Sequence, residues 1–112
     1  NRQGQWMQID LGAIRQIKGT VVQGRKDCCK QWVTRYRVMY STDGRLWSRV
    51  LGNFTGSKDP SRKSRVYFQR PVLARWVRLV VLGWHQHISM RAGVLACRSA
   101  DALVTGAPGA AV

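Results

Sequence analysis

Apolar and polar residues alternate with a period of two along much of this chain. The clearest stretch is residues 32–40, whose two faces are Trp32, Thr34, Tyr36, Val38 and Tyr40 on one side and Val33, Arg35, Arg37 and Met39 on the other. This period is typical of a β-strand, because successive side chains of a strand point to opposite faces. Less extended versions of the pattern predict strands at 6–11, 14–22, 46–51, 66–68, 75–82 and 88–95. No stretch sustains a helical period.

Turn signals separate these stretches. Asp43-Gly44 predicts a hairpin turn, and the polar residues 52–64 predict a loop. Short strands at regular spacing, divided by turns, indicate an all-β sandwich or barrel. After Cys97 the chain becomes rich in Ala and Gly and nearly uncharged. We therefore expect one domain over residues 1–98 and a tail or linker over 99–112.

Five tryptophans supply much of the bulk that a small core needs. Four of them lie on alternating strand positions, which favours core packing for Trp6, Trp32, Trp47 and Trp76. Trp84 follows Gly83 in a predicted turn, and we expect it to be partly exposed.

The charge balance is strongly basic, with 19 Lys and Arg residues against 5 acids and a formal net charge of +14. Such a field favours anionic partners, namely phospholipid head groups, sulfated glycans, acidic proteins or nucleic acid. All five acids are Asp, and they are scattered along the chain, which disfavours hydrolysis by paired carboxylates. No nucleophile and base lie at a supportive spacing, and no glycine-rich phosphate loop or base-stacking motif is present. These patterns disfavour an acid–base enzyme and nucleic-acid binding, and they give no sign of a cofactor.

Several separate motifs, in order along the chain, resemble the discoidin or coagulation factor V/VIII type C domain family. They are residues 6–12 (WMQIDLG), 21–25 (VVQGR), 32–36 (WVTRY), 40–44 (YSTDG), 54–56 (FTG), 71–78 (PVLARWVR) and 83–85 (GWH), followed by Met90-Arg91 and Cys97. The resemblance covers residues 6–97, and residues 82–85 and 88–91 are most similar to the retinoschisin branch. It implies a jelly-roll-like β-sandwich, or distorted barrel, whose loops, called spikes, bind ligands at one end.

By resemblance, the chain is a non-catalytic extracellular adhesion module that docks its parent protein to an anionic surface or partner. Family members bind anionic phospholipid, collagen or growth-factor tails, or sugars, and we take phospholipid as the first choice. The alternatives are a glycan- or heparin-binding module and a structural domain for protein–protein interaction or oligomerisation. Peripheral membrane contact is compatible with the sequence, since no apolar stretch approaches the roughly 20 residues of a membrane-spanning helix.

The apex of the family's third spike corresponds to the segment between Gly24 and Trp32. Two small apolar residues there, Cys28 and Cys29, are flanked by the cations Arg25, Lys26 and Lys30. An apolar tip with a basic collar suits an anionic membrane, where each basic residue contributes on the order of 1 kcal/mol. A disulfide to a partner and a plain exposed loop remain alternatives for this segment. Arg35 and Arg37 would add longer-range steering if they face outward.

The sequence departs from the family pattern in two places. The part of the family domain that precedes Trp6, with the first strand and first two spikes, is missing from this chain. Gly93 stands where the family usually has a Glu two positions after the Arg that corresponds to Arg91. A buried Arg without its acid is costly, so Arg91 needs another partner, and we expect Asp10 to fill that role.

The remaining polar candidates concern location and metal binding. Cys97 matches the family's last cysteine, which implies a disulfide to a cysteine upstream of residue 1 and an oxidising, extracellular setting. Asn53-Phe54-Thr55 is an N-glycosylation sequon that fits the same setting. His85 and His87, even together with Cys28 and Cys29, match no standard zinc spacing, so we expect no metal site.

Overall fold

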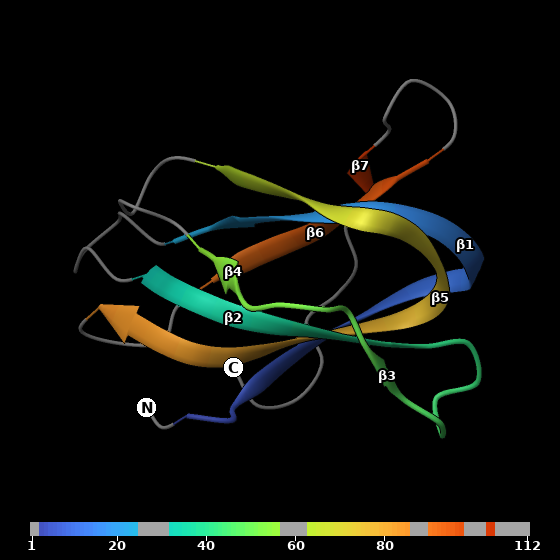
Figure 1. The fold of residues 1–112 in the computed structure, drawn as a ribbon, viewed down its shortest axis with the longest axis horizontal. Helices are drawn as coiled ribbons and strands as arrows, with labels where there is room; N and C mark the ends of the chain where they lie inside the picture. Colours follow the sequence, from blue (N-terminus) through green and yellow to red (C-terminus); the bar gives the residue numbers. More distant parts are fainter. Residues whose placement is uncertain (1–2, 25–31, 57–62, 86–89, 98–102, 105–112) are drawn as a thin grey trace.

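Every regular element that the computed structural model describes is a β-strand (Figure 1). The structure describes residues 3–24, 32–56, 63–85, 90–97 and 103–104. Over these residues the strands are β1 (Trp6–Gln23), β2 (Trp32–Ser41), β3 (Ser48–Arg49), β4 (Phe54–Thr55), β5 (Ser64–His85), β6 (Arg91–Ala96) and β7 (Leu103–Val104). All pairings are antiparallel, in the order β3-β2-β5-β1-β6-β7, and β4 also pairs with β2. The predicted all-β class and sandwich architecture are confirmed.

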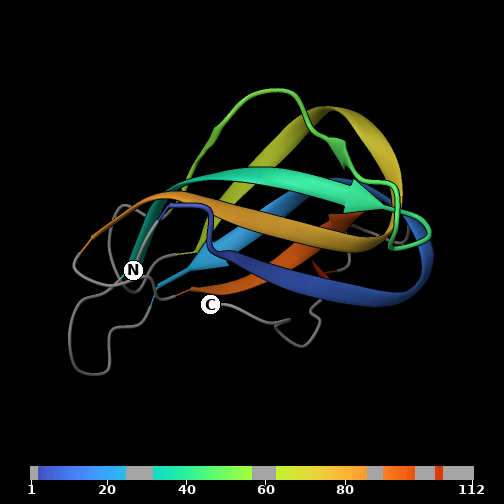
Figure 2. The same cartoon turned by 90° about the horizontal axis from the view of Figure 1, so that it is seen from below.

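Two long strands turn this single sheet into two packed layers. The register of β1 with β5 jumps from Asp10 opposite Trp76 to Arg15 opposite Ala74, and both strands bend there (Figures 1 and 2). The part of β1 before the bend pairs with the second half of β5, and that half of β5 pairs on its other side with β2. The part of β1 after the bend pairs with the first half of β5 and, on its other side, with β6. Gly12 lies in the bend with a φ of 78°, a conformation that other residues rarely adopt.

This bend corrects two predictions from the alternation. Residues 6–11 and 14–22 are one strand, β1, and residues 66–68 and 75–82 belong to one strand, β5. An irregularity in the register interrupts the period of two without ending the strand. A similar register shift between Val33 and Arg35 places Val33, 2% exposed, on the same buried side as Tyr36. The alternation had assigned these two residues to opposite faces.

The core lies between the two layers and consists mainly of β-branched and aliphatic side chains. Its fully buried members include Ile9, Ile17, Val22, Val38, Val77, Leu79, Val81 and Val94, together with Tyr36. The hydroxyl groups of Tyr36 and Thr20 are 2.7 Å apart, so that the two buried polar groups satisfy each other. Burial raises the pKa of Tyr36 to about 12, an effect that the hydrogen bond with Thr20 partly offsets.

Three of the four tryptophans that were predicted to pack in the core lie outside it. Trp6, Trp47 and Trp76 are half-buried, and arginine side chains cover their rings. The guanidinium carbon of Arg78 is 4.2 Å from the ring centre of Trp6 and 3.9 Å from that of Trp47. The side chain of Trp32 lies outside the described residues. Trp84 is half-buried against the core, as expected.

The edges of the sheet also differ from the sequence prediction. The predicted return strand 46–51 contains only the two residues of β3, and Leu46 and Leu51 are 80% and 81% exposed. β4 lies inside the predicted loop 52–64 and pairs with Arg35 and Tyr36. The antiparallel hairpin between β2 and β3 is confirmed, and the Asp43 carboxylate accepts the backbone N–H groups of Arg45 and Leu46 in its turn.

The last strands extend slightly beyond the expected limits. β6 occupies most of the predicted strand 88–95, of which residues 88 and 89 lie outside the described residues. β7 lies within the expected tail and pairs with Val94 and Leu95. The division between residues 1–98 and 99–112 stays a prediction.

Candidate ligand-binding end

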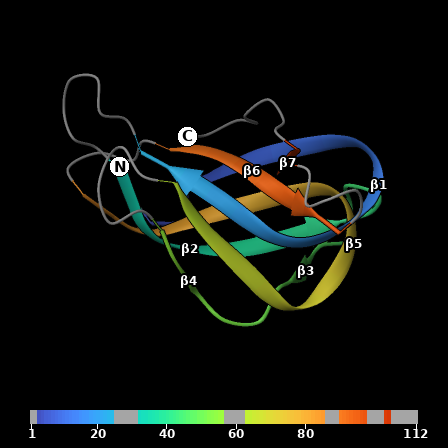
Figure 3. The ribbon, with the colours of Figure 1, turned by 90° about the horizontal axis from the view of Figure 1, so that it is seen from above.

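The strand termini next to the predicted spike gather at one end of the sandwich (Figure 3). Gln23, at the end of β1, is opposite Arg91, and Trp32 at the start of β2 is opposite His85. Ser64, which begins β5, is opposite Val22. We call this region the strand end. Described residues from the ends of β1 and β5 and from the starts of β2, β5 and β6 therefore lie at this end.

A small pocket of about 190 Å³ opens at the strand end. Three residue pairs at the end of the β1–β6 ladder form most of its wall, and Lys63, directly before β5, forms the rest. The lining residues are Val21, Val22, Gln23, Lys63, Arg91, Ala92 and Gly93. We call it the strand-end pocket. Its described lining has two cations and no acid, so its field favours an anion.

Arg91 is exposed and does not pair with Asp10, which corrects the predicted partner. Its Nη2 atom donates a long hydrogen bond of 3.5 Å to the carbonyl oxygen of Gly24, the last described residue before the spike. Asp10 instead accepts from Arg75, with Nε and Oδ1 3.1 Å apart. The Arg75 guanidinium, together with the N–H of Gly12, lowers the pKa of Asp10 below its ordinary value. Because Arg91 is exposed and not buried, the cost of a buried unpaired charge does not arise.

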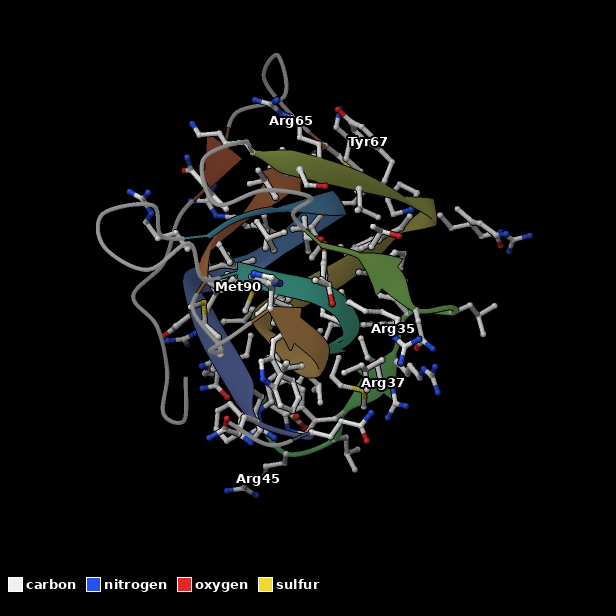
Figure 4. The ribbon with its side chains drawn as sticks, turned by 90° about the vertical axis from the view of Figure 1, so that its left-hand side faces the viewer. Arg35, Arg37, Arg45, Arg65, Tyr67 and Met90 are labelled. Carbon is white, nitrogen blue, oxygen red and sulfur yellow. The ribbon has the colours of Figure 1, made fainter. Side chains whose placement is uncertain are left out.

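None of the predicted contact residues belongs to the described part of the structure. Arg25, Lys26, Cys28, Cys29 and Lys30 all lie outside the described residues. Their role in binding stays a prediction. Met90 is buried directly before Arg91 and belongs to the core beneath this end (Figure 4).

The two proposed steering residues lie on the outward side of β2. Arg35 is exposed and Arg37 is half-buried, and Figure 4, which views the strand end, shows both side chains on the same flank of the sandwich. The Nε atom of Arg37 is buried, and no hydrogen-bond partner for it exists among the described residues. Neither of these cations belongs to the lining of the strand-end pocket.

The other candidate residues are placed as follows. Cys97 is a half-buried free thiol, and its predicted disulfide to an upstream cysteine stays untested. Asn53 is exposed, and its Oδ1 atom accepts a hydrogen bond of 3.0 Å from Arg49. His85 is exposed, while His87 lies outside the described residues. Within the described ranges, no three His, Cys, Asp or Glu side chains form a group that could hold a metal ion.

Sequence reasoning did not select Lys63 as a site residue, and it treated Arg91 only as a residue in need of a partner. Lys63 belongs to a dense basic run with Lys58, Arg62 and Arg65, and this run was the available signal. Charge density alone does not show that Lys63 lies beside β6. Only the pairing of Val22 with both Ser64 and Ala92 brings them together.

Comparisons with known proteins agree with this architecture. A profile of the F5/8 type C domain matches residues 1–94. Mouse retinoschisin is 41% identical over 102 residues, which are 85% of this chain and 45% of the relative. Pig lactadherin is 34% identical over 105 residues, or 87% of this chain and 26% of the relative. The chain thus spans less than half the length of these relatives.

Among solved structures, discoidin II from Dictyostelium discoideum superposes with a TM-score of 0.80. The match covers 88% of this chain and 39% of that protein, at 24% sequence identity. At this identity the likeness establishes the fold, a jelly-roll sandwich. In the residues described, no helix is long and apolar enough to cross a membrane.

Proposed function

This chain belongs to the F5/8 type C, or discoidin, domain family, and we propose that its strand end docks the parent protein onto an anionic phospholipid surface. The family consists of non-enzymatic modules for adhesion and binding. The observation that carries the proposal is the strand-end pocket, in which Lys63 and Arg91 present two positive charges without a described acid.

The chemistry of the pocket suits a single anionic group. Its volume of about 190 Å³ is below the 300 Å³ or so of a typical site for a whole small molecule. A phosphate or carboxylate of a lipid head group needs less room and gains charge-assisted hydrogen bonds from Lys63 and Arg91. Gly93 supports this interpretation, because a Glu at this position, as is usual in the family, would add a carboxylate to the same lining.

The spike between Gly24 and Trp32 would supply the apolar part of the contact. Arg91 contacts the carbonyl of Gly24, so the pocket and the root of the spike are adjacent. The Cys28-Cys29 pair and its three flanking cations follow Gly24 in the sequence, and we expect them to take part in the same membrane contact. This arrangement combines head-group recognition with shallow insertion at the interface.

We place the module outside the cell, as a secreted or cell-surface protein. The Asn53 sequon supports this location, since Asn53 is exposed and accessible to glycosylation. The disulfide expected for Cys97 would also require an oxidising compartment. An oligomeric assembly or an acidic protein partner is the further possibility if vesicles are not bound.

The test is co-sedimentation of the protein with phosphatidylserine-containing and neutral vesicles at about 150 mM salt. We expect selective binding that weakens about fivefold for Lys63→Gln and for Arg91→Gln, since each charge contributes about 1 kcal/mol near acidic lipid. Arg45→Gln is the matched control, because Arg45 is exposed in the β2–β3 turn, and its loss should change binding less than twofold.

The double variant Cys28→Ser/Cys29→Ser tests the spike separately. Weaker binding by this variant supports insertion at the spike apex. Unchanged binding with a loss in the Lys63 and Arg91 variants restricts the contact to head-group recognition. Failure to bind either vesicle overturns the phospholipid proposal.

A sulfated glycan is the second candidate ligand, favoured by the outward flank of Arg35 and Arg37. A long polyanion could extend from the strand end along this flank, whereas a flat membrane need not contact it. We expect heparin affinity to fall for Arg35→Gln/Arg37→Gln with little change in vesicle binding if the glycan is the ligand. Equal affinity of this variant and the unaltered protein for heparin would reject that alternative.

A further inference from the structure

A second, larger hollow of about 330 Å³ lies on the side of the sandwich, where β3 and the residues after it face the first half of β5. We call it the side groove. Buried Val50 and Phe68, each 8% exposed, and half-buried Tyr40 and Val72 provide apolar lining. Arg49 and Arg70 add the two cations, and the exposed Leu51 completes the apolar rim. None of the strand-end pocket residues takes part in it.

An irregularity in β5 creates one wall of the side groove. Tyr67 pairs with Gly19 and Val72 pairs with Ile17, so Lys18 alone stands opposite the four residues 68–71. These four residues therefore bulge from the ladder. Bulges redirect side chains that a regular strand would alternate. In this bulge Phe68 is buried in the core, while Gln69 and Arg70 are exposed beside the groove.

No acid among the described residues balances the charges at the side groove. The described residues that line it include no Asp or Glu. Arg49 donates from Nη2 to the neutral amide oxygen of Asn53, 3.0 Å away, which satisfies a donor and leaves the positive charge. Arg70 is exposed and forms no ion pair or hydrogen bond with any other described side chain. Asp10 and Asp43 are engaged elsewhere, with Arg75 and within the β2–β3 turn.

We infer that the side groove binds a small amphiphilic carboxylate, with its apolar body on the floor and its carboxylate between Arg49 and Arg70. The volume is at the lower end of the range for small-molecule sites, and the lining has the usual combination of apolar surface with a few polar groups. Two guanidinium groups from different strands give a carboxylate charge-assisted donors on two sides. This site is independent of the proposed function at the strand end.

Addition of a peptide strand is the less suitable occupant. Over residues 64–74, β5 pairs with β1 and with no other described strand, so its second edge is open. However, Pro71 lies in this edge and lacks an N–H group, and the bulge interrupts the regular spacing of donors and acceptors. Both features protect an edge against strand addition. The apolar floor and its paired cations therefore favour a small ligand.

The experiment is a titration of the isotope-labelled protein with octanoate, followed by backbone amide chemical shifts. We expect saturable shifts at residues 49–51, 68–70 and 72, and smaller ones at 91–93. Octanol, which has the same chain without the charge, should bind at least about fivefold more weakly. Glucuronate, which has the charge on a polar ring, should also bind more weakly.

Two charge variants and a matched control decide the assignment. Arg49→Gln and Arg70→Gln should each weaken octanoate binding about three- to tenfold, the range expected for a partly exposed charged hydrogen bond. Arg45→Gln, with the same change in net charge, should leave it within twofold. Equal binding of octanol, stronger binding of glucuronate, shifts confined to other residues, or an equal loss in the Arg45 variant would each overturn the proposal.

Discussion

One layer of the sandwich contains β2, the first half of β1 and the second half of β5. Its inner and outer faces use large side chains in opposite ways. On the inner face, Tyr36 is fully buried, pairs with Thr20 and lies next to Phe54, with ring centres 5.9 Å apart. On the outer face, Trp6 and Trp47 stay half-buried and hold the guanidinium of Arg78 between them. The comparison shows that bulk does not decide burial in this sandwich. Smaller branched residues fill most of the core, whereas Trp6 and Trp47 stack with Arg78 on the outer surface of the layer.

The inner face should give the largest effect on stability. Tyr36→Ala removes a fully buried ring and leaves the Thr20 hydroxyl without its partner. We expect the free energy of unfolding to fall by about 3–5 kcal/mol, as for other aromatic-to-alanine changes in cores. Urea denaturation followed by circular dichroism measures this loss. If Tyr36→Ala lowers the free energy of unfolding no more than Trp47→Ala does, the proposed difference between the inner and outer faces is wrong.

Alkaline pH should weaken the inner face through the same residue. The pKa of Tyr36 is about 12 when folded and 10.0 as its ordinary value, so the unfolded chain loses its proton first as the pH rises. Stability is therefore intact below pH 10 and falls between pH 10 and 12, by about 2–3 kcal/mol. Denaturation at several pH values should show this decline in the unaltered protein. Tyr36→Phe should remove most of it, and an equal decline in that variant would contradict the assignment.

The outer face should give a smaller effect. Arg78→Gln removes the cation from both tryptophan rings and changes the contact between Arg78 Nε and Gln8 Oε1, which are 2.9 Å apart. We expect a loss of about 1–2 kcal/mol, because stacked cations contribute about 0.5–1 kcal/mol per ring at partly exposed sites. Thermal unfolding provides the measurement, and Arg78→Lys serves as the control that keeps the charge. If Arg78→Gln lowers the free energy of unfolding as much as Tyr36→Ala, the outer face contributes as much to stability as the core, and the prediction is wrong.

The exposed ion pair at the bend should give the smallest effect. The pKa of Asp10 is lowered in the folded state, chiefly by Arg75, so its stabilising contribution is present above the ordinary pKa of 3.8 and is lost as the pH falls through the lower folded value. Asp10→Asn should therefore reduce the acid sensitivity of unfolding slightly below pH 4. A large loss of stability at pH 7 in this variant would show that Asp10 does more than pair with Arg75 on the surface.

Much of the layer structure could be predicted from the sequence, because one-sided burial imposes a period of two. The alternation of Met7, Ile9 and Leu11 correctly marks the buried side of β1, with exposed fractions of 4%, 0% and 6%. The same pattern already places Trp6 on the opposite side, and residue size led to the wrong expectation of core packing. Alternation cannot show register shifts such as the one beside Arg35, which brings Val33 to the buried face instead of the outer face that the period of two predicts.

The candidate site was predictable only in part. Sequence resemblance indicates which end of the sandwich carries the binding loops, and the residues proposed there in segment 25–30 remain predictions. The strand-end pocket depends on pairing between distant segments, which brings Lys63 to Arg91. The side groove depends on the bulge at residues 68–71, and Pro71, the local signal there, does not show which side chains the bulge redirects.

Vesicle binding by two double variants of equal charge tests the central claim most directly. Lys63→Gln/Arg91→Gln removes both cations of the strand-end pocket, and Arg49→Gln/Arg70→Gln removes both cations of the side groove. The strand-end variant should bind phosphatidylserine-containing vesicles at least about tenfold more weakly, while the side-groove variant should stay within about twofold of the unaltered protein. Equal losses in the two variants would show that net charge alone attracts the protein to the vesicles. A loss only in the side-groove variant would show that the side groove, and not the strand end, contacts the membrane.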